Sequence, residues 1–470
     1  MPKTNQQADK STILLLLALP VFYFLFFLFR PDGGINLDGI VYARMALQLP
    51  GLENNLFPPG YPVLLRLMHF YTQDYFVAGK VLHFLCLIGI LAFSYRQKFY
   101  FRETILLLCC RAGIGIWSFS YSEIPFLGCL YLQFFLVEQY LSGRAGRFWL
   151  PAMICLQLSM LLLRYSGIFM LAGPLLFTFL LFLSGGSNGK VQFRKWLYYL
   201  LGASLLMAVY LLWNKNVFGS LFGEHLRGGP GTTESAALAR HFWLNLHGLL
   251  ASGNPFFSLV FENGETGILG MLIWLVDLIF LIVTATIASR VWRDGILFYR
   301  YLLLSGIAYC LLLFFSSFGA GLETIGSRLL APGLWCLYLP VLIGISNLLK
   351  GKKMFLLGGS LLLFNFLLLL KVPAWYPGIR EQAKTILMDN PEYRYFLTDR
   401  DSIPIRRYSI PLTGKAIEYR HPVLARSYIN FHALAILRPQ IRQIDSSEAV
   451  NLPKAQLIRN SACRINPDFR

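Results

Sequence analysis

Ionisable side chains cluster in this sequence at the ends of its hydrophobic runs. Asp38 follows the first run, Glu123 opens a later one, and Arg164 and Arg328 stand where two further runs begin. Charges at membrane depth are costly, so they usually pair or line a wet cavity. A carboxylate can accept the proton of an attacking hydroxyl, and guanidiniums can stabilise an anionic leaving group. We therefore expect one chemical site there, shared with the neighbouring residues Arg44, Glu224, His225, Arg227 and Glu323.

The elements that must hold these residues are membrane helices. Of 470 residues, 56% are hydrophobic and only 14% are charged. The apolar runs are continuous rather than alternating, and lipid admits helices for such runs. Because many runs are near the length that crosses a bilayer, we predict an all-α polytopic membrane protein with about eleven transmembrane helices. Their expected positions are 12–30, 76–95, 104–121, 123–141, 149–163, 165–183, 197–213, 266–289, 299–316, 329–348 and 354–371.

The charges of the loops predict how the chain is oriented. The run 12–29 is too long for a signal peptide and no small-residue cleavage site follows it, so we expect a retained anchor. With a cytoplasmic N-terminus, every inner loop carries Lys or Arg, as the positive-inside rule requires. The pieces 31–75 and 214–265 then face outward. We expect a transmembrane domain, 1–371, and a small extracytoplasmic α/β domain, 372–470, whose mixed charge begins after "PAWYPG". The compact loops suggest a bacterial inner membrane.

The net charge and the cysteines exclude other classes. The formal charge is +18, but the basic residues occupy short loops and do not interleave with aromatic residues on a soluble face. We therefore expect membrane lipids as partners and no nucleic acid. Of the eight cysteines, seven lie in apolar runs and Cys463 lies in the tail. They are expected to be small buried hydrophobes rather than metal ligands or disulfides.

The segment 36–66, "NLDGIVYARMALQLPGLENNLFPPGYPVLLR", lies between two of the predicted spans. Its apolar residues recur at helical spacing, which predicts short amphipathic helices in the membrane interface. Asp38 either caps the first of these helices or takes part in chemistry, and both readings remain open. Pro58 and Pro59 forbid a helix and Gly60 permits a turn, so this part predicts a rigid joint.

The same segment carries a resemblance. "LDGIVYARMA" followed by "FPPGYPVLLR" resembles the first outer loop of the C-type (GT-C) superfamily of integral-membrane glycosyltransferases. Protein O-mannosyltransferases and lipid A aminoarabinose transferases belong to that superfamily. Four later segments resemble its motifs in the same order, and the likeness covers about residues 12–348. They are "YSEIPF" at 121–126, "RYSGIFML" at 164–171, "WNKNVFGSLFGEHLRG" at 213–228 and "ETIGSRLLAPGLW" at 323–335.

The resemblance implies a glycosyltransferase without a cofactor. It would move a sugar from a polyprenyl-phosphate donor to a protein, lipid or glycan acceptor on the outer face of the membrane. Asp38 matches the family's catalytic acid and would act as the base. Glu123 would orient the acceptor or Asp38, or it is a half-buried acid paired with an Arg. For Arg164 and Arg328 the alternative is snorkelling to lipid headgroups. The residues expected to bind substrate are Arg44, Pro59, Tyr61, Arg164, Tyr165, Arg227 and Arg328.

A metal site is not expected. Glu224 and His225 are adjacent in a loop poor in other ligands, and Asp32 and Asp38 are spaced more widely than the metal-binding acids of oligosaccharyltransferase-type members. We predict inverting transfer that needs no metal. Arg111 falls inside a predicted span, where it is either the buried partner of an acid or a contact for a lipid phosphate.

Two other functions compete with this hypothesis. A transporter or flippase of lipid-linked sugars would favour internal repeats and ionisable residues near the membrane midplane. A glycan polymerase or ligase also works on the outer face, and it would favour a large late outer loop rich in Arg and His. Here the ionisable residues concentrate outside, and the long loop lies between the seventh and eighth predicted spans.

Overall fold

The structure, a computed structural model, describes most of the chain. The residues it describes are 10–30, 33–35, 37–117, 119, 121–183, 187–226, 235–254, 268–318, 325–348, 352–369, 375–389, 391, 395–397, 405–409, 416–420, 431–444 and 457–459.

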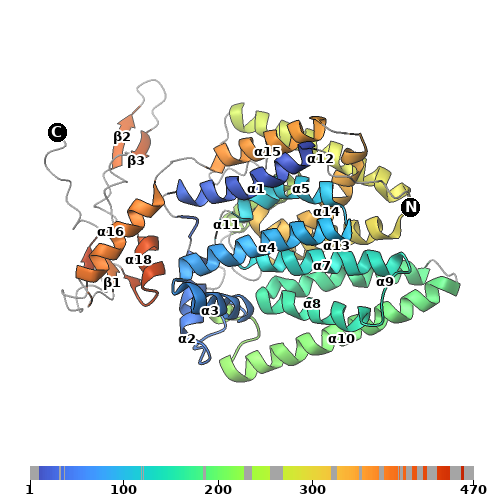
Figure 1. The fold of residues 1–470 in the computed structure, drawn as a ribbon, viewed down its shortest axis with the longest axis horizontal. Helices are drawn as coiled ribbons and strands as arrows, with labels where there is room; N and C mark the ends of the chain where they lie inside the picture. The colour runs from blue at the N-terminus through green and yellow to red at the C-terminus, as the bar shows by residue number, and fades with distance from the viewer. Residues whose placement is uncertain are drawn as a thin grey trace.

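Long helices lie side by side and form most of the molecule (Figure 1). Among the described residues, seven helices are long and apolar enough to cross a membrane: Tyr75–Gln97, Glu123–Leu141, Tyr165–Leu183, Val191–Phe218, Trp274–Arg293, Leu297–Ser316 and Ser327–Ser346. Three apolar helices are shorter: Thr12–Leu28, Trp149–Leu163 and Phe355–Leu367. The helical membrane class is thus supported, with seven candidate spans against the eleven expected.

The helices follow one another as α1 (Lys10–Leu28), α2 (Leu37–Gln48), α3 (Gly60–Thr72), α4 (Tyr75–Gln97), α5 (Phe101–Cys109), α6 (Arg111–Trp117), α7 (Glu123–Leu141), α8 (Trp149–Leu163), η1 (Tyr165–Leu171), α9 (Ala172–Leu183) and α10 (Ser187–Phe218). After η2 (Glu224–Leu226) come α11 (Ser235–Ser252), α12 (Ile268–Arg293), α13 (Leu297–Ser316), α14 (Ser327–Leu348) and α15 (Lys352–Leu369).

The prediction of one span over 104–121 is wrong, because the chain there forms two short helices. Cys110 between α5 and α6 has an extended backbone (φ −67°, ψ 161°) that ends α5. At Gly113 a Cβ atom would lie 2.6 Å from the carbonyl oxygen of Leu108. Only glycine therefore permits α6 to fold back against the end of α5.

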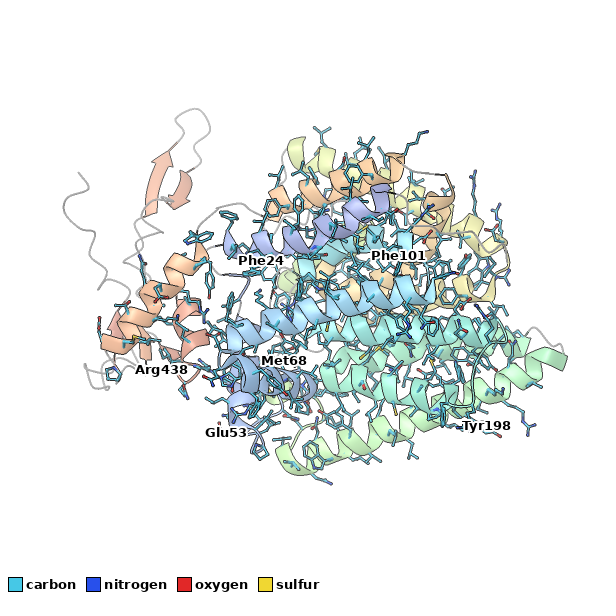
Figure 2. All side chains as sticks on the ribbon, in the orientation of Figure 1. Phe24, Glu53, Met68, Phe101, Tyr198 and Arg438 are labelled. Atoms are coloured by element: carbon cyan, nitrogen blue, oxygen red, sulfur yellow. The ribbon has the colours of Figure 1, made fainter. Side chains whose placement is uncertain are left out.

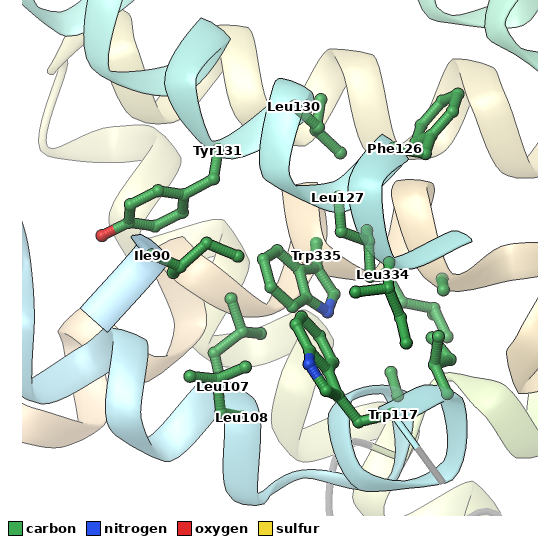
Figure 3. Packing of buried hydrophobic residues seen from close by; sticks show 14 of the residues in the cluster. Ile90, Leu107, Leu108, Trp117, Phe126, Leu127, Leu130, Tyr131, Leu334 and Trp335 are labelled. Atoms are coloured by element: carbon green, nitrogen blue, oxygen red, sulfur yellow. The ribbon is translucent and has the colours of Figure 1, made fainter. Parts of the chain in front are cut away.

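Helix α14 lies at the centre of the bundle, because 83% of its span is buried, whereas only 11% of the span in α12 is buried. Trp335 of α14 stacks on Trp117, with ring centroids 5.9 Å apart. Figure 3 shows this pair surrounded by aliphatic side chains such as Leu107 and Leu334. Burying such large rings contributes strongly to packing, and it ties α14 to α6.

The described cysteines are unpaired, and most of them agree with the prediction of small buried hydrophobes. Cys109, Cys110, Cys310 and Cys336 are buried, and Cys86 and Cys129 are partly buried. Cys155 is the exception, since it is exposed on α8. Cys463 lies outside the described residues.

The tail contains helices and short strands. Helices α16 (Tyr376–Asp389) and α18 (Phe431–Leu437) accompany β1 (Tyr395–Leu397), β2 (Ile405–Ser409), β3 (Ala416–Arg420), β4 (Arg442–Ile444) and β5 (Leu457–Arg459). Strand β1 pairs in parallel with β4 and β5, and β2 pairs antiparallel with β3. These strands are few and short, so an independent α/β domain stays a prediction.

Candidate active site

Helices of the segment 37–72 and of the tail lie together at one end of the bundle. Figure 1 shows α2 and α3 there, beside α16 and α18. In Figure 2, Glu53 and Arg438 lie at this end, whereas Phe101 and Tyr198 lie toward the other. The four helix ends that carry Asp38, Glu123, Arg164 and Arg328 meet at the end with α2.

Four of the predicted residues form one chain of alternating charges, here named the ion chain: Asp38, Arg328, Glu123 and Arg164. Arg328 pairs with Asp38 through its Nη2 atom. Its Nε donates to Glu123 Oε1 at 2.8 Å. Arg164 pairs with the same Glu123 oxygen through Nη1. Two carboxylates and two guanidiniums from four separate segments therefore neutralise one another.

Helix ends place both acids favourably. Asp38 lies in the first turn of α2 and Glu123 in the first turn of α7. The positive end of a helix dipole stabilises a carboxylate at such positions. Helix α2 is held against the bundle by its buried face, which includes Ile40, Tyr42 and Ala43. Asp38 is thus carried on a packed helix rather than on a loose loop.

The exposed fraction of the side chains differs along the ion chain. The Glu123 side chain is 0% exposed and Arg164 is 13% exposed, whereas Arg328 and Asp38 are 23% and 26% exposed. A reactant can therefore reach Asp38 and Arg328 but not Glu123. The buried Glu123 carboxylate pairs with both guanidiniums, as the alternative of an acid paired with an Arg predicts, and its role toward the acceptor or Asp38 stays a prediction.

An aromatic ring that the sequence interpretation missed also holds Arg328. The guanidinium carbon of Arg328 lies 3.9 Å from the centroid of the Tyr121 ring. Such cation–π contacts stabilise a guanidinium without neutralising its charge. The aromatic residue beside Ser-Glu in "YSEIPF" is the signal that could have revealed it.

The double-proline joint positions Arg164. Pro59 precedes α3, and a Cβ atom on Gly60 would lie 2.5 Å from the carbonyl oxygen of Leu162. The absent side chain lets the start of α3 contact the backbone of α8 directly before Arg164. Pro59 therefore belongs to a structural joint, and its predicted contact with substrate stays a prediction.

Tyr61 also has a supporting place. It is fully buried, and its hydroxyl lies 2.9 Å from His83 Nε2. Its ring meets Tyr42 edge-on, and the Tyr42 hydroxyl lies 2.8 Å from Ser122 Oγ. Burial, followed by the charge of Glu123, raises the pKa of Tyr42, so its hydroxyl stays neutral. These tyrosines connect α2 and α3 to the start of α7.

Tyr165 lies in a second buried network. Its hydroxyl donates to the Asn55 carbonyl at 2.9 Å and accepts from Asn214 Nδ2 at 3.1 Å. Asn55 donates in turn to the Ser220 carbonyl at 2.9 Å. At Gly223, where φ is +68°, a Cβ atom would lie 2.4 Å from the Asn55 carbonyl oxygen. The motif "NKNVFGSLFG" thus packs on the segment that holds Asn55, and Tyr165 joins the two through its hydroxyl, while its contact with substrate stays a prediction.

Arg44 lies apart from the ion chain. Its Nε and Nη2 donate to the carbonyls of Pro439 and Ile441, which follow α18. A second ion pair between Arg380 and Asp74 joins α16 to the N-cap of α4. Arg44 therefore holds the tail against α2, while its predicted contact with substrate stays a prediction.

The structure describes few of the remaining predicted residues. Arg227, Asp32 and Glu323 lie outside the described residues. Glu224 is exposed and accepts from the backbone N–H of Phe222. Within the described ranges, no three His, Cys, Asp or Glu side chains gather as metal ligands would.

No protein-family model, curated protein or solved structure matches this chain.

Proposed function

We propose that this protein is a membrane glycosyltransferase of the GT-C type, which transfers a sugar from a polyprenyl-phosphate donor to an acceptor on the outer face of the membrane. The observation that carries the proposal is the ion chain, which presents a partly exposed carboxylate beside a partly exposed guanidinium. Both groups stand at the ends of apolar helices, where the phosphate of a lipid-borne donor would lie.

The proposed reaction is a single displacement. The acceptor hydroxyl oxygen attacks the anomeric carbon, and the Asp38 carboxylate accepts the hydroxyl proton. The bond from the anomeric carbon to the phosphate oxygen breaks, and its electron pair leaves with the polyprenyl phosphate. Arg328, with Arg164 behind it, stabilises the charge that develops on that phosphate. One displacement inverts the anomeric configuration, and no metal is required.

Glu123 acts in this scheme as a positioning residue. It holds both guanidiniums at one carboxylate and leaves the outer N–H groups of Arg328 toward the exposed side of the ion chain. When a donor phosphate takes over those groups, the Asp38–Arg328 pair opens and the carboxylate of Asp38 becomes available to the acceptor. Phosphate is a good partner for this purpose, because guanidinium forms bidentate hydrogen bonds with it.

The proposed topology places the ion chain outside. The opposite end of the bundle bears exposed basic residues in its loops, including Lys98, Arg144 and Arg147. The positive-inside rule then favours the cytoplasm for that end, with a cytoplasmic N-terminus and an extracytoplasmic tail. A bacterial inner membrane fits these compact loops.

The test uses the purified full-length protein with a panel of polyprenyl-phosphate sugars, and mass spectrometry follows the loss and transfer of sugar. We expect Asp38→Asn to lower the rate by about 100-fold or more, as for the loss of a general base. Glu53→Gln is the matched control, because Glu53 is an exposed acid of the same segment. Full activity of Asp38→Asn would remove Asp38 as the base. Movement of an intact lipid-linked sugar across the membrane, without transfer, would instead favour the flippase.

A further inference from the structure

Arg111 is a cation that the ion chain does not use. It opens α6 after the break at Cys110, and its side chain runs along its own helix toward Gly115. The Nε and Nη1 atoms are buried, and within the described part of the chain neither has a hydrogen-bond partner. Buried guanidinium nitrogens without partners are costly, so a partner from outside the described chain is expected.

The charge near Arg111 makes this cost larger. Arg30 acts on the Arg111 guanidinium as a like charge. Two guanidiniums that repel each other become favourable neighbours when they share one anion. Phosphate suits such a pair best, since its oxygens accept several N–H groups at once.

Aromatic contacts show where Arg30 lies relative to the ion chain. The guanidinium carbon of Arg30 lies 4.2 Å from the centroid of Phe119. The Phe119 and Tyr121 rings stack with centroids 5.1 Å apart, and Tyr121 in turn contacts Arg328. Arg30 and Arg328 are thus at the same end of the bundle, and two rings connect them. The Arg30–Arg111 pair therefore lies beside the ion chain and shares no residue with it.

Helix α1 ends two residues before Arg30. Helix α1 exposes Leu17, Val21 and Phe24 along its length, as a helix in contact with acyl chains does. Arg30 follows the end of this helix, at the level where headgroups lie.

We propose that Arg111 and Arg30 bind a phosphate group, and that this group acts as the counter-ion of the broken α5–α6 segment. A lipid headgroup and free phosphate share the required chemistry. The inference does not depend on the proposed glycosyl transfer, because it concerns different residues and needs no reaction.

The experiment measures thermal unfolding of the full-length protein in detergent, after removal of lipid. Dioleoyl phosphatidic acid should raise the Tm by about 3 °C or more, whereas dioleoylglycerol, which has the same tails and no phosphate, should not. Arg111→Gln and Arg30→Gln should lose this rise. Arg147→Gln should keep it, because Arg147 is an exposed arginine of a distant loop.

A second variant protects the test against simple misfolding. Arg111→Leu removes the buried charge, so without lipid it should be at least as stable as the parent protein, and it should not respond to phosphatidic acid. A rise with inorganic phosphate as well would show that the phosphate alone suffices, and a rise with phosphatidic acid alone would identify a lipid-borne group. Equal responses of Arg111→Gln and the parent protein, or no response of the parent to either phosphate, would overturn the proposal.

Discussion

The two ends of the helical bundle use similar ion pairs in different ways. At the end with α2, Glu123 is 0% exposed and lies between two guanidiniums that are 13% and 23% exposed. At the opposite end, Glu138 pairs with Arg144, whose side chain is 58% exposed. The first arrangement excludes water from an anchored carboxylate, whereas the second leaves a cation in solvent.

The difference in exposure indicates different roles for the two groups of charges: the buried one fixes side chains in place, and the exposed one marks a loop. An exposed arginine contributes little to stability, but it still retains a loop on one side of the membrane. A buried carboxylate between two arginines fixes the direction of both guanidiniums, and its removal leaves two charges uncompensated. Exposure, rather than residue type, thus distinguishes the two ends.

The largest expected effect is at Glu123. Glu123→Gln should destabilise the protein by about 3–5 kcal/mol, because Arg164 and Arg328 would lose their shared carboxylate. Thermal unfolding in detergent measures this loss. Glu138→Gln is the matched control at the other end and should cost far less. Similar losses for the two variants would erase the contrast between the ends.

The next effect concerns Arg44. Arg44→Ala should weaken the docking of the tail by about 1.5–3 kcal/mol, since hydrogen bonds from a charged donor to two carbonyls are lost. Hydrogen–deuterium exchange should then become faster in both α18 and α2. Arg66→Ala is the control, because Arg66 on α3 donates to Tyr75 of α4. Unchanged exchange in α18 would show that Arg44 is not the attachment.

Gly60 tests the close approach between α3 and α8. Gly60→Ala should cost about 1–3 kcal/mol through overpacking against the Leu162 carbonyl. The Tm measures this cost, and Gly128→Ala on α7 is the control, since a Cβ there would meet no atom within 4 Å. If both alanine variants behave alike, the joint does not rely on glycine.

The smallest effect is expected at the exposed arginine. Arg144→Ala should change stability by less than about 1 kcal/mol, because the Arg144 side chain is 58% exposed and Gln139 still donates to Glu138. The Tm checks stability, and labelling of a cysteine placed in the 142–147 loop checks topology. A loss as large as that of Glu123→Gln would show that this pair is structural too.

Much of the molecule follows from local pattern. Continuous apolar runs predicted a helical membrane protein, and most described helices overlap the expected ranges, as in α7 and α13. Asp38 in the first turn of a short helix and the break at Pro58-Pro59-Gly60 also follow from residue preference alone. These features depend on neighbours within a few residues, so periodicity and turn chemistry suffice to predict them.

Contacts between distant segments depend on packing. Asp38 and Arg328 are separated by 290 residues, and Arg44 and Ile441 by 397. Periodicity cannot tell that Tyr61 and Tyr165 are buried in hydrogen-bond networks, that Glu123 is enclosed by two arginines, or that Gly113 folds α6 back onto α5. Each of these results from the way whole helices fit together, because burial and partner choice are properties of the assembled bundle rather than of any one helix.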